Sequence, residues 1–250
     1  MTPNVVADVG NTCIKWGLCS PDAVIESASL PPDDPEAWQH QVEAWHLPHP
    51  ASWAVAGVHP QRRDRLVQWL HLRGDSVAVL DDWHSLPLAV KVPKPESVGI
   101  DRLLDAVAVN ELRQPSRPAV VIDAGSAVTV DWIDETGAFA GGAILPGFGL
   151  MAKSLHDYTA LLPMIELPKQ MPAVPGLTTV PAIEAGVFWA VVGGVRGLVA
   201  AYARRFDAFP EVFLTGGDAP LIAATPLDSA RVCPLLTLDG IRLAARAISH

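Results

Sequence analysis

The chain has 250 residues, of which half are apolar, and it carries 27 acidic against 18 basic side chains for a formal charge of −9. So acidic a chain lacks the clustered Lys and Arg that general nucleic-acid binding needs, and we expect no nucleic-acid partner. The length and the apolar content suffice for the core of one large domain or two modest ones.

The first half of the chain reads as an α/β layer. After an apolar run that begins at Val5, strands are expected over 13–18, 23–30, 53–58 and 76–80, with helices over 36–45 and 61–72. Pro60 stands where helices accept proline, at the first turn. The segment 91–97 carries two prolines and is expected to be a loop, followed by a helix over 102–112.

The second half repeats this order after a linker at 114–118. Strands are expected over 119–123, 127–133 and 138–145, then a helix over 150–158 and a proline-containing loop over 163–181. A long helix over 182–205, a strand over 212–214 and a helix over 240–248 complete the chain. The glycines of the long helix lower its helix propensity, and close helix packing would explain them.

Two segments of the chain, 115 residues apart, are nearly the same. Asp8-x-Gly10 and Asp123-x-Gly125 each follow an apolar run and precede a second strand-like run. An Asp at the end of a buried strand is costly unless it meets a metal, a proton or a donor, and the glycine lets the backbone approach a ligand. A duplication explains the repeat, and it predicts two related domains, 1–115 and 116–250, with a polyphosphate gripped by both turns.

The first turn offers Asp8, Gly10, Asn11, Thr12 and Lys15 for this task. A turn with main-chain N–H groups and a nearby ammonium suits phosphate, and a carboxylate can hold hydrated Mg²⁺. The alternative is a simple hairpin turn with an exposed lysine.

The second turn offers Asp123, Gly125 and Ser126, and the returning strand adds Thr129 and Asp131 on one face because side chains alternate along a strand. The alternative is a hairpin capped by aspartate. Gly216-Gly217, after a buried strand, could let an adenine ring lie against the backbone, or form an ordinary turn.

A third cluster, Gly99, Asp101 and Arg102, stands between the proline-containing loop and a helix. Asp101 is a candidate general base, and Arg102 could clamp an anionic substrate. The alternative is that Asp101 only caps the helix. We expect His156 to be packed or exposed rather than catalytic, and the eight tryptophans to serve packing.

The cysteines and the apolar runs bear on location. Three cysteines without a CxxC predict neither a disulfide framework nor a zinc site. The longest convincing apolar run, 185–195, is too short to span a membrane. We therefore expect a soluble cytoplasmic protein without a membrane partner.

Taken together, these motifs resemble those of the type III pantothenate kinases, a branch of the acetate kinase, sugar kinase, Hsp70 and actin superfamily. The resemblance runs nearly end to end and rests on five blocks in family order: Asp8-Val9-Gly10-Asn11-Thr12-x-x-Lys15, Gly99-Ile100-Asp101-Arg102, Asp123-Ala124-Gly125-Ser126-Ala127-x-Thr129-x-Asp131, Gly141-Gly142-Ala143-Ile144-x-Pro146-Gly147 and Thr179-x-x-Ala182-Ile183-x-x-Gly186.

The resemblance implies two ribonuclease H-like (actin-like ATPase) domains with a central cleft, a homodimer, and ATP-dependent phosphorylation of pantothenate, the first step of coenzyme A biosynthesis. It implies Mg²⁺, with Asp8 as a candidate ligand, and a monovalent cation (K⁺ or NH₄⁺) at Asp123. It implies Asp101 as the catalytic base. The implied ATP-binding residues are Asp8, Val9, Gly10, Asn11, Thr12, Cys13, Ile14, Lys15 and Ser126. The implied pantothenate-binding residues are Val92, Gly99, Ile100, Asp101, Arg102 and Thr179, and Thr179 could come from the partner subunit.

Two positions depart from the family pattern. Ser126 stands where the family usually has Thr and keeps the hydroxyl, whereas Val92 stands where the family usually has Tyr, so one substrate contact is missing or replaced. Two other functions therefore stay open: a regulatory accessory factor that keeps the fold without kinase activity, and another phosphotransferase or phosphohydrolase of the superfamily.

Overall fold

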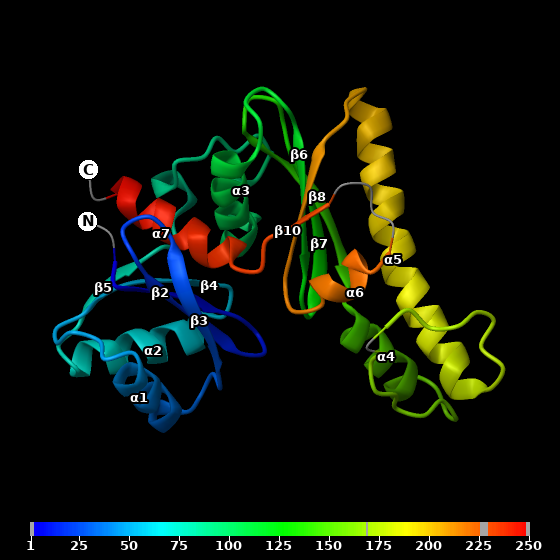
Figure 1. The fold of residues 1–250 in the computed structure, drawn as a ribbon, viewed down its shortest axis with the longest axis horizontal. Helices are drawn as coiled ribbons and strands as arrows, with labels where there is room; N and C mark the ends of the chain where they lie inside the picture. Colours follow the sequence, from blue (N-terminus) through cyan, green and yellow to red (C-terminus); the bar gives the residue numbers. More distant parts are fainter. Residues whose placement is uncertain (1–2, 169, 226–229, 249–250) are drawn as a thin grey trace. The chain divides into compact units, whose positions relative to one another are not determined.

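The computed structural model describes residues 3–168, 170–225 and 230–248, and these form two compact units (Figure 1). The first unit contains the chain up to Leu112 together with the segment from Leu235 onward, and the second runs from Arg113 to Pro234. Each unit holds one five-stranded sheet, so the expected α/β class with two related halves is confirmed.

The first unit is a mixed sheet with helices on both faces (Figure 1). Its strand order is β3-β2-β1-β4-β5, in which β1, β2 and β3 form an antiparallel meander and β4 and β5 join in parallel. Its elements are β1 (Val5–Val9), β2 (Ile14–Cys19), β3 (Val24–Leu30), α1 (Pro35–Ala44), β4 (Ser52–Gly57), α2 (Pro60–Leu72), β5 (Ser76–Val79), the 3₁₀ turns η1 (Trp83–Ser85) and η2 (Pro95–Ser97), α3 (Ile100–Leu112) and α7 (Leu236–Ile248).

Tryptophans fill the core beneath α1 and α2. Trp16 of β2 and Trp53 of β4 are buried, and their ring centroids lie 4.8 Å apart in an edge-on arrangement. Trp38 of α1 meets Trp69 of α2 in the same way at 5.5 Å. These rings pack against one another, as favourable aromatic pairs do, which confirms the packing role expected of these tryptophans.

The last helix of the chain, α7, packs on the first unit. The range 116–250 expected for the second domain includes this helix, so the structure differs from the expectation here. The physical reason is a close helix crossing: a Cβ on Gly240 would lie 2.1 Å from the carbonyl oxygen of Leu104 in α3. In addition, Asp239 accepts the N–H of Val24 in β3 at 3.3 Å. The other expected boundary, near residue 115, lies close to the observed one at Leu112.

The second unit repeats the sheet of the first. Its order, β10-β9-β6-β7-β8, again has an antiparallel meander (β6, β7, β8) with two strands added in parallel beside β6. Its elements are β6 (Ala119–Ala124), β7 (Ala127–Ile133), β8 (Phe139–Pro146), α4 (Phe148–Asp157), α5 (Thr179–Phe206), β9 (Glu211–Thr215), α6 (Ala219–Ala223) and β10 (Arg231–Val232).

The long helix α5 belongs to the core of this unit. By length and composition alone it could cross a membrane, but it buries Phe188, Val191 and Val195 in the cluster that also holds the inner residues of β6 and β7. Among its glycines, only Gly194 meets a neighbour: a Cβ there would lie 2.8 Å from Leu145. Within the described part of the chain, a Cβ on Gly186, Gly193 or Gly197 would meet no atom within 4 Å outside the neighbouring helix backbone. Packing within the chain therefore explains one glycine of the four.

Candidate active site

The β1–β2 turn of the first unit has the predicted strand–turn–strand form. The N–H of Gly10 donates to the carbonyl oxygen of Cys13 at 3.1 Å and closes the turn. Asn11 and Thr12 stand exposed at its tip. Asp8 and Lys15 are directly opposite each other on β1 and β2, so the carboxylate and the ammonium share one face of the sheet.

The hydrophobic residues of this turn contribute differently from the polar ones. The side chains of Val9 and Ile14 are fully buried in the core, so only their main-chain groups are available to a ligand. Cys13 is partly buried and has no disulfide partner. Of the predicted ATP-binding residues in this motif, the side chains that can reach a ligand therefore belong to the polar positions.

The end of β4 connects this turn with the Asp101 cluster. Val9 and Gly57 are paired across the parallel strands, and a Cβ on Gly57 would lie 2.4 Å from the carbonyl oxygen of Val9. The next residue, Val58, comes close to Gly99: its Cγ1 lies 3.6 Å from the position of a Cβ there. The carboxyl edge of the first sheet thus leads from the turn to Gly99, a link that the sequence motifs do not reveal.

Asp101 lies inside the first turn of α3 as its second residue. Its Oδ1 accepts the N–H of Arg102 at 2.8 Å, a contact with the next residue and not the usual capping bond to a later N–H. Burial raises the pKa of the Asp101 carboxyl above the usual value, while the N–H and the charge of Arg102 act in the opposite direction. A carboxylate with a raised pKa is suited to accept a proton.

Gly99 makes room for this carboxylate. A Cβ at Gly99 would lie 2.5 Å from Oδ1 of Asp101, a distance that side-chain carbons do not adopt. Ile100, between them, is buried and anchors the start of α3. The glycine of the Gly99-Ile100-Asp101-Arg102 motif is therefore required by the position of the catalytic candidate.

The other two predicted substrate residues lie elsewhere. Val92 is partly buried in the loop before η2, and this loop is in the first unit, as Asp101 is. Thr179 is the exposed first residue of α5 and belongs to the second unit. The structure therefore groups Val92 with Asp101 in one unit and does not group Thr179 with them.

In the second unit, Asp123 lies where β6 meets the end of β9. Asp123 is paired with Thr129 of β7 on one side and with Thr215 of β9 on the other. Gly216 has φ +93°, and a Cβ there would lie 2.4 Å from Oδ1 of Asp123. The predicted Gly216-Gly217 turn thus packs its backbone on the aspartate.

A second carboxylate is held near this point. The N–H of Asp218 donates to the carbonyl oxygen of Ala124 at 2.9 Å, and burial raises the pKa of the Asp218 carboxyl. Neither the motif spacing nor the repeat singled out Asp218, because only the pairing of β9 with β6 brings the two segments together.

The turn that carries Ser126 is closed by Gly147. The N–H of Gly147 donates to the carbonyl oxygen of Ser126 at 3.0 Å, and a Cβ on Gly147 would lie 2.3 Å from the carbonyl oxygen of Gly125. The Pro146-Gly147 break therefore shapes the second turn, and Ser126 stays exposed there.

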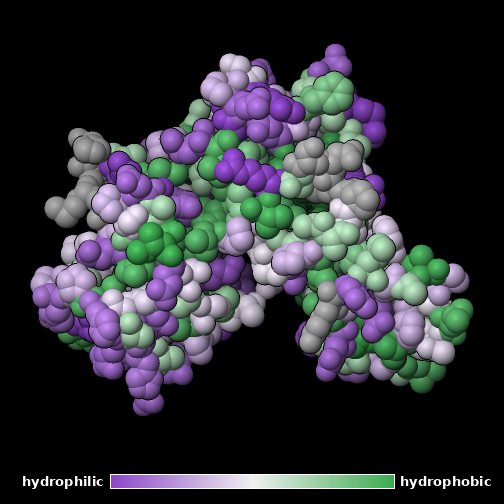
Figure 2. Space-filling model, viewed as in Figure 1, coloured by the Kyte–Doolittle hydropathy of each residue, from purple (hydrophilic) through white to green (hydrophobic). Residues whose placement is uncertain are grey.

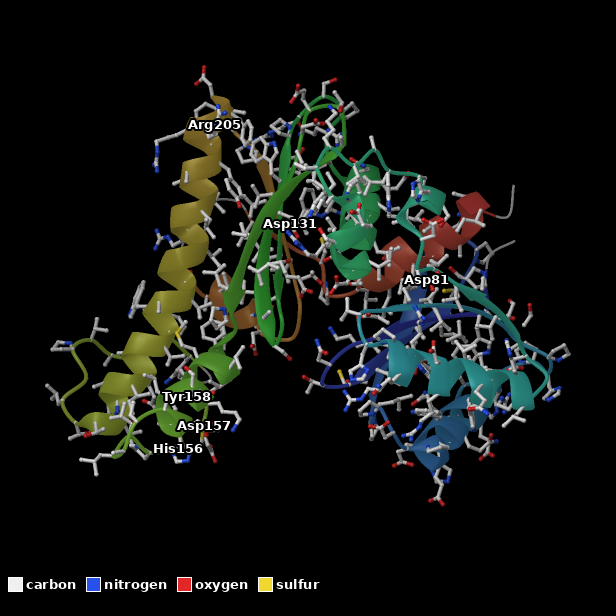
Figure 3. The ribbon with its side chains drawn as sticks, turned by 180° about the vertical axis from the view of Figure 1, so that it is seen from behind. Asp81, Asp131, His156, Asp157, Tyr158 and Arg205 are labelled. Carbon is white, nitrogen blue, oxygen red and sulfur yellow. The ribbon has the colours of Figure 1, made fainter. Side chains whose placement is uncertain are left out.

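Asp131 and His156 differ in their surroundings. Asp131 is almost fully buried on β7 opposite Gly142, which leaves space for its carboxylate. His156 is exposed near the end of α4 beside Asp157 and Tyr158 (Figure 3), and its Nδ1 lies 3.0 Å from the carbonyl oxygen of Leu162. The expectation that His156 is packed or exposed is confirmed.

The donor groups present fit a particular kind of metal site. Within the described ranges, no three His, Cys, Asp or Glu side chains gather in a metal-holding group. Mg²⁺ that binds a nucleotide takes one or two carboxylates, and the phosphates and water supply its other ligands. A lone carboxylate such as that of Asp8, beside a turn that can receive phosphate, fits this pattern.

Two α/β units with the same sheet order, each with an Asp-x-Gly turn at the end of its first strand, define a protein of the actin-like and sugar-kinase ATPase fold. Solved structures of this fold align over nearly the whole chain. A Campylobacter jejuni protein described as a Baf family transcriptional activator has a TM-score of 0.61 at 21% identity, with 97% of each chain covered. A glucokinase from an Antarctic psychrotroph has a TM-score of 0.52 at 12% identity, with 98% of this chain and 99% of the other covered.

The sequence comparisons identify the family within this fold. The model of the type III pantothenate kinase family matches residues 4–201, and the chain belongs to this family. A type III pantothenate kinase from Synechococcus sp. (strain JA-3-3Ab) is 34% identical over 242 residues, which cover 95% of this chain and 90% of the relative. Another from Acidiphilium cryptum (strain JF-5) is 38% identical over 175 residues, which cover 66% of this chain and 65% of the relative.

Proposed function

We propose that this protein transfers the γ-phosphoryl group of ATP to the primary hydroxyl of pantothenate, the first step of coenzyme A biosynthesis. The observation that carries the proposal is the placement of Asp101, whose pKa burial raises, beside Gly99 at the edge that also holds the Asp8–Lys15 turn. Family membership supports this substrate.

In the proposed reaction Asp101 accepts the proton of the pantothenate hydroxyl as that oxygen attacks the γ-phosphorus. The bond between the γ-phosphorus and the β–γ bridging oxygen breaks, and ADP leaves. In phosphoryl transfer the protein mainly positions the reactants and neutralises charge. The main chain of the Gly10–Cys13 turn and the ammonium of Lys15 would position the phosphates and neutralise their charge. When bound, Mg²⁺ would neutralise phosphate charge, with Asp8 as its carboxylate ligand.

The remaining substrate contacts follow from the chemistry of pantothenate. Its carboxylate matches the guanidinium of Arg102, which can donate two parallel hydrogen bonds. The main chain of Gly99 and Ile100 borders the hydroxyl that reacts. Val92 provides an apolar contact, and Thr179 is the contact that we assign to a partner subunit.

We propose a monovalent cation, K⁺ or NH₄⁺, at Asp123. The supporting observation is Thr129, which is paired with Asp123 across β6 and β7 and whose buried hydroxyl has no hydrogen-bond partner among the residues that the structure describes. A cation that takes oxygen ligands would satisfy it. Thr129→Val should then raise the K⁺ concentration needed for half-maximal activity. Thr159→Val is the control, because the hydroxyl of Thr159 is exposed and donates only to the helix carbonyl oxygen of Leu155; it should leave the K⁺ requirement unchanged. Equal K⁺ requirements for both variants would contradict a cation at this site.

We further propose a homodimer through the exposed side of α5. Gly186, Gly193 and Gly197 leave open space there, and small residues allow another helix to come close. Large apolar side chains, including those of Leu161 and Leu177, are exposed at the end of the unit that holds α4 and the start of α5 (Figure 2). Gly193→Arg should convert the protein to monomers in light scattering, and a parent protein that is itself monomeric would contradict the proposal.

The test of the activity is an assay of ADP release with and without pantothenate, each at two K⁺ concentrations. The proposal expects ADP release that depends on pantothenate and increases with K⁺. Release of ADP at the same rate without pantothenate would indicate a phosphohydrolase instead. We propose a cytoplasmic location with no membrane or nucleic-acid partner.

A further inference from the structure

Arg62, a residue of α2 outside all the sequence motifs, reaches the β1–β2 turn. Its Nη1 donates a hydrogen bond to the carbonyl oxygen of Asn11 at the tip of that turn. The two residues are 51 positions apart in the chain. The topology brings them together, because β4 is parallel to β1 and the chain therefore enters α2 at the same edge where the turn lies.

The position of this guanidinium is fixed at several points. Its Nε lies 3.4 Å from Oδ2 of Asp33, and the side chain is one-quarter exposed. The main-chain N–H of Arg62 donates to Nδ1 of His59, which caps α2, at 3.4 Å. Arg62 is thus held from the helix, from the segment after β3 and from the turn, and a side chain held in this way is ordered before a ligand arrives.

The guanidinium has more N–H donors than these contacts use. It adds a positive charge to a turn in which Lys15 already faces the Asp8 carboxylate across the strands. Arginine binds phosphate oxygens through its planar fork more specifically than lysine does. The Arg62 side chain therefore combines a positive charge, unused N–H donors and a contact with the turn.

We propose that Arg62 is a nucleotide-positioning residue, which holds the Asn11 carbonyl and presents its guanidinium to the phosphates of ATP. This inference rests on the ATP site of the proposed function. Arg62 has no role in the chemical step under this proposal. Its replacement should therefore lower the affinity for ATP and leave the affinity for the alcohol substrate unchanged.

The chain offers a matched control in Arg65. This residue is on the same helix and pairs with the same Asp33, at 2.6 Å, but it is more exposed and makes no contact with the turn within the described residues. Arg62→Gln and Arg65→Gln therefore remove the same charge from the same helix, and only the first removes the guanidinium from the turn.

The experiment measures binding of ATP by calorimetry without pantothenate, and then the KM of each substrate. Arg62→Gln should weaken ATP binding and raise the KM for ATP by about tenfold or more, as expected for the loss of a charged hydrogen-bond donor. Arg65→Gln should stay within about twofold of the parent protein, since exposed ion pairs contribute little. Arg62→Lys should recover part of the affinity.

Two readouts separate positioning from a merely structural role. The urea midpoint of Arg62→Gln should equal that of Arg65→Gln, and ATP binding by the parent should weaken with added salt more steeply than binding by Arg62→Gln, because salt screens the charge. Unchanged ATP affinity in Arg62→Gln, or an equal loss in Arg65→Gln, would overturn the inference. If ATP binding depends on Arg62 but the protein does not phosphorylate pantothenate, the proposed function is contradicted and the inference about Arg62 is kept.

Discussion

Gly99→Ala tests whether the exact placement of the Asp101 carboxylate matters. The added Cβ would lie 2.5 Å from Oδ1 of Asp101, whereas ordinary contact begins at 3.4 Å, so the carboxylate must move by about 0.9 Å. The next nearest atoms, Cγ1 of Val58 at 3.6 Å and Cγ of Asp101 at 3.7 Å, are at ordinary contact distances. The variant should fold normally and misplace the base.

The size of the effect follows from this displacement. A misplacement of about 1 Å in a reacting group costs about 100-fold in rate. This corresponds to about 2.7 kcal/mol of transition-state stabilisation. We therefore expect kcat for pantothenate-dependent ADP release to fall about 100-fold, with ATP affinity and the urea midpoint close to those of the parent protein.

Gly149→Ala is the matched control, because it adds the same methyl group to α4 at an ordinary 3.8 Å from Leu167. Its kcat should equal that of the parent. The reasoning is refuted if Gly99→Ala keeps its full kcat, or if it loses activity only in proportion to a loss of folded protein.

Four further predictions concern Asp101 and Gly216. Asp101→Asn should lower turnover by about 10²- to 10⁴-fold while ATP binding, measured by calorimetry, is kept. Burial raises the pKa of Asp101 in the folded state, so the ionised carboxylate destabilises the folded protein above that pKa. Asp101→Asn should therefore have a higher melting temperature than the parent at neutral pH, and this difference should shrink in acid, where the parent carboxyl is protonated. For the same reason the pKa seen in the acid limb of kcat/KM should lie above 3.8, the ordinary value for aspartate, and a limb at or below that value would exclude Asp101 as the base. Gly216→Ala, with φ +93° and a Cβ 2.3 Å from the carbonyl oxygen of Ala124, should cost about 1–3 kcal/mol in urea unfolding, and an unchanged midpoint would contradict this.

The sequence predicts best those parts of the fold whose motif is repeated or whose apolar residues follow a regular pattern. The two Asp-x-Gly hairpins follow from apolar runs that end in a glycine turn, and the structure contains both. The start of α5 is at Thr179 and not at 182, because Pro181 fits the first turn of a helix. The five-residue α6 and the two-residue β10 were not expected, since such short segments hold no periodic pattern.

Contacts between distant segments could not be predicted from one sequence. The amphipathic helix α7 could have packed on either half, and contacts such as Gly240 against Leu104 and Asp239 with Val24 place it on the first. Arg62 reaches Asn11, and Asp218 joins Ala124, through the parallel pairing of β4 with β1 and of β9 with β6. Motifs supply the candidate residues for the chemistry, but strand pairing determines which other side chains surround them.

The central claim is most directly tested by mass spectrometry of the products formed from ATP, Mg²⁺, K⁺ and pantothenate by the purified protein. The account predicts one phosphopantothenate for each ADP released, and almost none with Asp101→Asn. A parent protein that binds ATP and is correctly folded, but forms no phosphopantothenate under these conditions, would contradict it.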